Sequence, residues 1–217
     1  MAKQERAIAT REALVAAAGR VFAAKHFETA RVADILTEAG ITQGAFYFHF
    51  PEGKKQIAEE LIQRQDAQFI QLRDELFNSD LDGLSAILAL SDALGQALHA
   101  DPVTQAGIRL VTQASTTFPD AAKLPDPTWI DAITTLLDRA RNDGGLHDDV
   151  DIPAAAYSLV YLFTGAQVSS FVNDNWTNVQ HILHAIEPFV LRALTAPGFT
   201  PRNHEQNAWG ANHSETA

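Results

Sequence analysis

The spacing of apolar residues along the chain is that of helices rather than strands. In segment 8–25 apolar residues recur at intervals of three and four positions, and they include Leu14, Ala18, Val21 and Phe22. Alternating β-branched residues are scarce, whereas alanine, leucine, glutamine and glutamate, which favour helices, are abundant. The sequence therefore predicts an all-α fold that begins with a helix over 8–25.

Two short helices separated by a tight turn are expected next. The first covers 31–38, and the apolar residues on its inward face are Val32, Ile35, Leu36 and Ala39. Thr29 is the expected cap of this helix, and Gly40 ends it. Thr42 then begins the next helix, which Pro51 prevents from continuing far.

The rest of the chain predicts six further helices. Their expected ranges are 52–78, 82–99, 102–114, 127–142, 152–172 and 177–195. Asp82, Asp101 and Asp151 are placed to cap three of them. The stretch 115–126 is rich in helix breakers and predicts a loop. From residue 197 onward, polar residues with Gly and Pro predict a disordered tail over 197–217.

The segment 29–55, TARVADILTEAGITQGAFYFHFPEGKK, has the order of a helix-turn-helix. In its second helix Ile41, Ala45 and Phe48 share one face at 100° per residue, and that face is expected to pack inward. Gln43 and Tyr47 lie together on another face, open to a partner. The alternative is a plain helical hairpin within a bundle, with Tyr47 in the core.

The outward residues of this segment have side chains that suit DNA. Gln43 can form paired hydrogen bonds with an adenine edge, and Thr42 can bond a base or touch a thymine methyl. Gly44 is small enough for the backbone to approach a groove closely. Phosphate contacts position a protein without reading sequence, and the candidates are Arg11, Thr29, Arg31, Tyr47, His49 and Lys54.

The net charge of −11 over 217 residues is unusual for a DNA-binding protein, but its distribution is uneven. Residues 1–55 hold eight Lys and Arg against six Asp and Glu, an excess of two. The remainder of the chain therefore carries −13. This asymmetry favours a polyanionic partner for the first part only.

Composition argues against several other classes of protein. There is no cysteine, so disulfides and thiolate metal sites are excluded. The start, MAKQERAIATR, lacks the apolar core of a signal peptide, and we expect a cytoplasmic location. No stretch is expected to approach the roughly 18 uncharged residues of a membrane span, so no membrane association is predicted.

No catalytic, metal or cofactor site emerges from the motifs. His181 and His184 share a helix face, but no carboxylate cluster accompanies them. Phosphate-cradling glycine loops and serine elbows are absent. Asp148, Asp149 and Asp151 are interpreted as a solvated acidic loop. We therefore expect no cofactor and no enzymatic activity.

The block AGITQGAFYFHF, followed closely by lysine, resembles the signature of TetR-family repressors. The preceding TREALVAAAGRVFAAKHFETARVADI is similar to the first two helices of that family, and the match runs through 8–62. Two departures stand out. The family often has lysine where Gln43 stands, and the turn PEGK is one residue longer than usual, which leaves Lys54 and Lys55 as alternatives for one phosphate contact.

The resemblance implies a domain plan and partners. Residues 1–52 would form the DNA-binding domain, and 53–196 an effector-binding and dimerisation domain. The partners would be near-palindromic double-stranded operator DNA, a small-molecule signal and a second copy of the chain. Helices 152–172 and 177–195 would build a four-helix bundle across the two-fold axis. The stripes expected there are Ala155, Leu159, Leu162, Phe163, Ala166 and Ser170, and Ile182, Ile186, Phe189, Val190 and Leu194.

The stretch KLPDPTWIDAITTLLDRA is similar to γ-butyrolactone-type autoregulator receptors of actinomycetes, a group within this family. That resemblance implies a pocket lined by Trp129, with Gln65 and Thr164 offering hydrogen bonds to the signal. Each also has a plainer interpretation: Trp129 as core, Gln65 as surface, and Thr164 bonded to its own helix. The expected function is a repressor released by a butyrolactone, butenolide or furan signal, controlling antibiotic or secondary-metabolite genes. A ligand-blind regulator, or a helical ligand-binding protein without DNA function, are the alternatives.

Overall fold

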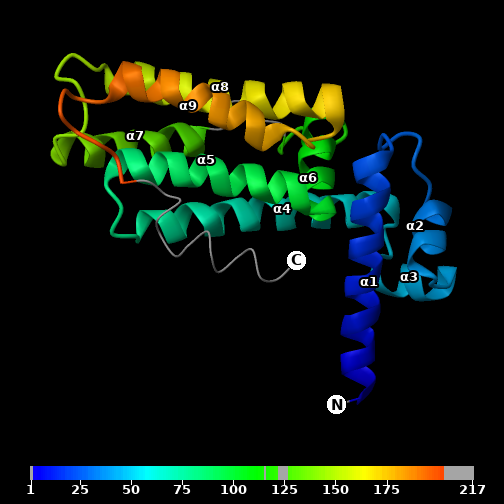
Figure 1. Cartoon of the computed structure of the whole chain (residues 1–217). Coiled ribbons are helices and arrows are strands. Elements are labelled where there is room, and N and C mark those ends of the chain that lie inside the picture. The colour runs from blue at the N-terminus through cyan, green and yellow to red at the C-terminus, as the bar shows by residue number, and fades with distance from the viewer. Residues whose placement is uncertain (1, 115, 122–126, 203–217) are drawn as a thin grey trace. The chain divides into compact units, whose positions relative to one another are not determined.

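The computed structural model describes residues 2–114, 116–121 and 127–202, and every regular element within them is an α-helix (Figure 1). The predicted all-α class is confirmed. The helices are α1 (Ala2–Ala24), α2 (Val32–Ala39), α3 (Gln43–His49), α4 (Lys54–Phe77), α5 (Gly83–Ala100), α6 (Pro102–Gln113), α7 (Pro127–Asn142), α8 (Ile152–Asp174) and α9 (Val179–Leu194).

Most predicted helix ends agree with the structure to within two residues, because they depend on local capping. Asp82, Asp101 and Asp151 each accept hydrogen bonds from backbone N–H groups at a helix start, as expected. The first helix begins at Ala2 instead of 8. The prediction that Thr29 caps α2 was wrong: Arg31 occupies the cap position, and its N–H donates to Asp34 at 2.8 Å.

By packing, the chain divides into two compact units that do not follow the order of the sequence. The first contains residues 1–70 and 100–124, and the second 71–99 and 125–217. Thus α6 belongs with the first three helices. It packs along α1 where Gly19 leaves room for Val103, since a Cβ on Gly19 would lie 3.0 Å from Val103 Cγ2. The functional boundary near residue 52 remains a prediction.

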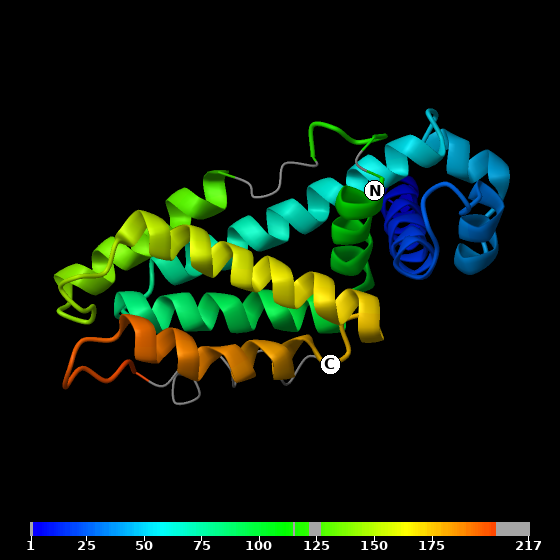
Figure 2. The same ribbon diagram turned by 90° about the horizontal axis from the view of Figure 1, so that it is seen from above.

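The second unit contains α5, α7, α8 and α9, of which α5, α8 and α9 run side by side (Figure 2). Gln180 on α9 donates to the backbone oxygen of Asp92 on α5 at 2.9 Å. At the start of α5, Gly83 lies directly against the backbone of α7, and its N–H donates to Asp143 at 2.9 Å. These close approaches fix α5 at the centre of the unit.

The helix α8 is more apolar than expected. It has no charged residue before Asp174, and by length and composition alone it is able to cross a membrane. The expectation that no stretch approaches a membrane span was therefore wrong, although core helices of soluble proteins pass the same test. A second apolar face explains the composition, because α8 exposes Tyr157, Tyr161, Leu162, Val168 and Val172.

The predicted stripe on α8 was wrong in phase. Ala166 and Ser170 are buried inside the chain instead of facing a partner, and Ser170 Oγ donates to Asp174 at 2.8 Å. Leu162 is exposed, as predicted. On α9 Phe189 is 72% exposed, whereas Leu194 is buried. The outward apolar face therefore consists of larger side chains than the sequence suggested.

The segment after α9 is fixed to the second unit, contrary to the prediction of a disordered tail from 197. Arg202 N–H donates to Asp82 at 3.3 Å, and Ser85 Oγ donates to the backbone oxygen of Arg202 at 2.9 Å. Phe199 lies close to Gly145. Residues 203–217 of that prediction lie outside the described residues.

Candidate nucleic-acid interface

One surface of α3 faces solvent and carries the residues expected to meet DNA. Thr42 caps the helix, and its Oγ1 accepts from Ala45 N–H at 3.4 Å. Gln43 and Gly44 in the first turn are exposed. Tyr47, one turn later, is 42% exposed, with its ring edge-on to Phe46 at 5.2 Å. Tyr47 therefore is not a core residue.

The largest exposed apolar side chain on this surface was assigned to the wrong face. Phe48 is 77% exposed, whereas Phe46 and Phe50 are buried, with ring centroids 5.7 Å apart. The prediction that Phe48 packs inward was wrong, because Phe46 and Phe50, four residues apart, form the inward face of α3. Phe48 joins the outward surface beside Tyr47. The i, i+4 spacing of Phe46 and Phe50 is compatible with this phase, but the spacing of Ile41, Ala45 and Phe48 is equally helical, so the sequence pattern did not decide between the two faces.

Gly44 has no packing role within the chain. A Cβ placed on it would meet no described heavy atom within 4 Å. The same substitution at Gly19 or Gly107 would bring the new carbon against a neighbouring helix. Glycine inside a helix costs roughly 0.5–1 kcal/mol relative to alanine. Packing within the described part of the chain therefore gives no reason for glycine at position 44.

Lys54 and Lys55 have different environments. Lys54 Nζ donates to the backbone oxygens of Phe27 at 2.7 Å and Ala30 at 3.1 Å, and lies 4.2 Å from the centre of the Phe27 ring. Lys55 is exposed and has a long contact of 3.6 Å to Glu59. The geometry gives Lys54 a structural role in the turn between α1 and α2, and leaves Lys55 accessible.

Arg11 belongs to a ring of four charged side chains that joins α1 to α4. Its guanidinium donates to both carboxylate oxygens of Glu60, at 2.9 and 2.7 Å. Arg64 donates to both oxygens of Glu12, at 2.6 and 2.7 Å, and also to Glu60 at 2.9 Å. Arg11 also lies 5.2 Å from the Phe50 ring centre. Arg11 therefore already has a bidentate anionic partner before any phosphate arrives.

The two arginines of this ring lower the pKa values of its two carboxylates. Hydrogen bonds from Arg11, and then from Arg64, lower the pKa of Glu60 to about 2, against the opposing effect of partial burial. Hydrogen bonds from Arg64 likewise lower the pKa of Glu12. Both carboxylates are therefore more acidic in the folded protein than in the unfolded chain, and the ring stays fully charged at neutral pH.

We expect Glu60→Gln to reduce stability by about 1 kcal/mol at neutral pH, a value discounted for the partial exposure of the ring. Because the folded pKa of Glu60 is depressed, its contribution is present above about pH 4.5 and is lost as the pH falls toward 2. Urea unfolding of both proteins between these pH values tests this expectation.

The stabilities of the two proteins should draw together as the pH falls from about 4.5 toward 2, and should become equal only below about pH 2, where Glu60 of the wild type is protonated as well. Glu59→Gln, one residue away in an exposed pair, is the control and should change stability by less than about 0.5 kcal/mol. If the free energies of unfolding of Glu60→Gln and the wild type differed by the same amount at every pH, the ring would not be what lowers the pKa of Glu60.

The other predicted phosphate contacts lie at the surface of the same unit. The Thr29 hydroxyl donates to His26 O at 3.1 Å and is exposed. Arg31 is exposed, and its side chain makes no hydrogen bond or ion pair with any described residue. His49 is half-buried beside the Phe48 ring, with ring centroids 5.0 Å apart. All three assignments remain predictions.

The residues expected to bind a signal are divided between the units. Gln65 is buried in the first unit against Gly107, on which a Cβ would lie 2.5 Å from Gln65 Cβ. Trp129 on α7 and Thr164 on α8 are half-buried in the second. Thr164 Oγ1 donates to Val160 O at 2.8 Å, the bond to its own helix considered above. The ligand assignments remain predictions. No cluster that suits a metal ion occurs among the described residues.

Comparison with known proteins gives the family. Residues 14–61 match the bacterial regulatory proteins of the tetR family, and residues 81–195 match the tetracyclin repressor-like C-terminal domain. The A-factor receptor protein of Streptomyces griseus is 27% identical over 198 residues, which make up 91% of this chain and 68% of that protein.

Two solved structures agree with this assignment. One, from work on the molecular basis for control of antibiotic production by bacterial hormones, is 31% identical with a TM-score of 0.73, over 87% of this chain and 99% of that one. TylP, a TetR regulator from Streptomyces fradiae, is 28% identical with a TM-score of 0.60, over 88% and 89%. The chain therefore belongs to the TetR family of bacterial regulatory proteins, and it is a DNA-binding repressor and not an enzyme.

Proposed function

We propose that this repressor binds a near-palindromic operator as a homodimer and is released by a small diffusible signal of butyrolactone, butenolide or furan type. The observation that carries the proposal is the solvent-facing surface of α3, where Gln43, Gly44, Tyr47 and Phe48 are exposed together and Gly44 has no packing role. An α-helix fits the major groove, and a bare backbone in its first turn permits close approach.

The dimer would form through α8 and α9. Their outward apolar residues are too large and too numerous to face water at no cost in a soluble monomer. A second copy related by a two-fold axis would cover them and place two α3 helices for two half-sites. In the simplest arrangement the half-sites lie one helical turn, about 34–36 Å, apart.

The signal class is proposed from resemblance to proteins that carry the names of hormone receptors, the A-factor receptor protein among them. Trp129, Gln65 and Thr164 would line the pocket. The genes controlled would be those of antibiotic or other secondary metabolism, and the repressor would act in the cytoplasm. The long helix α4 would carry the change from the signal to the DNA-binding helices, because Lys54 and Gln65 lie on it.

The test is selection of binding sites from random duplex DNA, followed by a gel-shift titration with butyrolactones, butenolides and alkylfuran acids. A selected palindrome that one class of compound releases supports both parts of the proposal. Operator DNA must then weaken binding of the signal by the same factor, because coupling is reciprocal. Signal affinity that is equal with and without operator rejects the release mechanism.

A ligand-blind regulator is the second candidate. One observation favours it: the hydroxyl of Thr164 already bonds to its own helix at 2.8 Å. This candidate predicts a selected palindrome that no compound releases. Selection of no sequence at all would reject operator binding in either form.

Gly44→Ala is expected to separate stability from DNA binding. The methyl group would meet no atom of the described residues within 4 Å, so alanine should raise the free energy of unfolding by roughly 0.5–1 kcal/mol. In a groove the same methyl would hold α3 away from the bases and weaken operator binding by about tenfold, or about 1.4 kcal/mol. Thermal unfolding and fluorescence anisotropy measure the two effects. Unchanged operator affinity would remove Gly44 from the interface.

A further inference from the structure

Most of the cationic side chains that the structure describes in the first unit have a partner within the chain. Those with a hydrogen bond or ion pair to a described residue are Arg11, Arg20, Lys25, Lys54, Lys55, Arg64 and Arg109. Among the described cationic side chains of this unit, only Arg6 and Arg31 have no such partner. Arg31 is already among the predicted phosphate contacts, but Arg6 is not.

Arg6 lies on a part of α1 that the rest of the unit leaves uncovered. The first fully buried residue of this helix is Leu14, and Arg6 precedes it by about 12 Å along the helix axis. Between them the helix is mostly exposed, including Ile8 at 56%. The segment also precedes the family match, which begins at residue 14.

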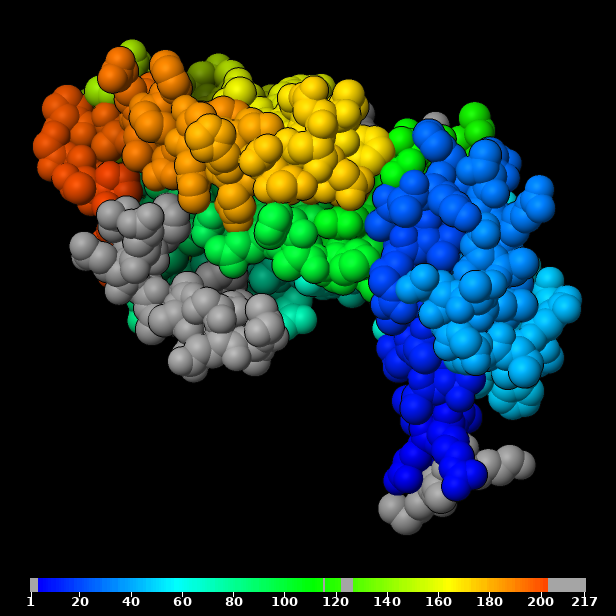
Figure 3. All heavy atoms as spheres, turned by 45° about the vertical axis from the view of Figure 1, so that its right-hand side comes forward, coloured from blue at the N-terminus to red at the C-terminus, as the bar shows by residue number. Residues whose placement is uncertain are grey.

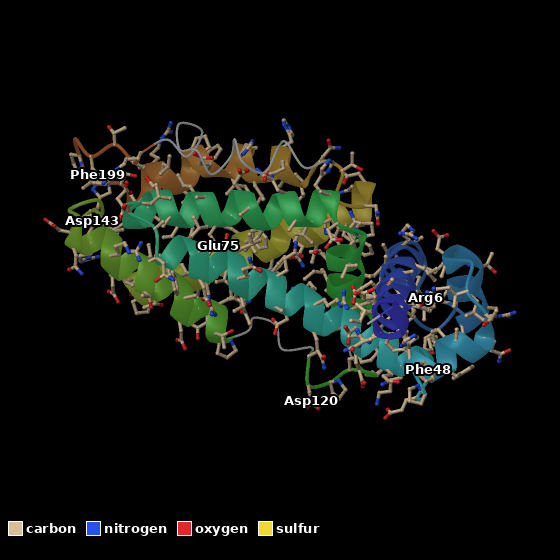
Figure 4. The ribbon with its side chains drawn as sticks, turned by 90° about the horizontal axis from the view of Figure 1, so that it is seen from below. Arg6, Phe48, Glu75, Asp120, Asp143 and Phe199 are labelled. Carbon is tan, nitrogen blue, oxygen red and sulfur yellow. The ribbon has the colours of Figure 1, made fainter. Side chains whose placement is uncertain are left out.

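This uncovered half of α1 projects on the side of the unit that carries α3. Figures 1 and 3 both show the N-terminal part of α1 extending past α2 and α3. Figure 4 looks along α1 from the end at which it starts, and it labels Arg6 near that end and Phe48 on the neighbouring α3. A duplex lying against the exposed surface of α3 would meet the start of α1 as well.

We propose that the N-terminal extension of α1 is a second DNA-contacting element, in which Arg6 binds a backbone phosphate outside the major-groove contact of α3. A guanidinium presents paired donors that match phosphate oxygens, and Arg6 has no internal carboxylate to give up. The inference rests on the proposed operator binding. It assigns a sequence-independent contact to Arg6, which adds affinity on any DNA without changing the bases selected.

The test is anisotropy of the selected operator duplex with the full chain, between about 50 and 200 mM salt. Loss of one phosphate contact reduces the slope of log affinity against log salt by about 0.9, which corresponds to about eightfold weaker binding at 0.1 M salt. Arg6→Gln should show both effects. Arg6→Lys retains the charge and should keep the slope.

Two matched variants serve as controls. Arg20→Gln removes the same charge from the same helix, but Arg20 is paired with Glu38 at 2.6 Å, so the slope should not change. Glu5→Gln alters the neighbouring exposed residue and should not weaken binding. Trimming the duplex to the bases under α3 should abolish the difference between Arg6→Gln and the wild type.

The outcomes separate this inference from the proposed function. Wild-type protein that selects no operator refutes the proposed function itself. If the wild-type protein binds the operator with a steep salt dependence, and Arg6→Gln has the same affinity and the same salt dependence, the role of Arg6 is overturned and the proposed function is not. A loss equal to that of Arg20→Gln also overturns it, because the effect would then be one of net charge.

Discussion

Replacing Gly83 with alanine is expected to lower the free energy of unfolding by about 3 kcal/mol, the largest effect of any substitution considered for this protein. A Cβ at this position would lie 2.2 Å from Ala140 N, 2.3 Å from Leu136 O and 2.7 Å from Ala140 Cα. These are backbone atoms of α7, which cannot rotate away as the end of a side chain does. The backbones of α5 and α7 must therefore move apart at this contact.

Thermal and urea unfolding of the full chain measure this loss. Gly44→Ala is the matched control, because it makes the same chemical change inside a helix with nothing nearby, and it should stabilise slightly. The Gly83 N–H bond to Asp143 would break along with the packing. An alanine variant as stable as the wild type would mean that α5 and α7 lie farther apart than in this structure.

Lys54→Met is expected to cost about 2–3 kcal/mol of stability, because two backbone oxygens lose a charged donor. Nζ of Lys54 holds the oxygens of Phe27 and Ala30 at the turn that leads into α2, and it also sits over the Phe27 ring. Methionine preserves the length and the apolar stem of the side chain. Operator binding should fall as well, since the position of α2 and α3 depends on this turn.

Lys55→Met distinguishes the structural role from a phosphate contact. Its exposed side chain should contribute less than about 0.5 kcal/mol to stability. If Lys55 binds phosphate, its loss reduces the salt slope by about 0.9 without changing the unfolding curve. If Lys54→Met instead reduced the slope of log affinity against log salt and left the stability unchanged, Lys54 would be the residue that contacts phosphate.

The sequence by itself determined the elements of this protein. Helix ends followed from local signals such as Asp82, Asp101 and Asp151, whose carboxylates need only the next turn of backbone. The helix-turn-helix followed from the same kind of information, with Gly40 in the left-handed conformation at the end of α2. Resemblance in the AGITQGAFYFHF block then gave the family.

Only the tertiary structure decided which side chains are exposed and free to bind DNA. Phe46 and Phe48 lie on one short helix with similar composition around them, and only the packing of α3 against α1 and α2 buries one and exposes the other. The partners of Arg11 and Lys54 lie 49 and 24 to 27 residues away in sequence. A local pattern carries no information about such partners, because they meet only when distant helices pack. The fold was therefore predictable from periodicity and capping, whereas the set of cations free to meet DNA was not.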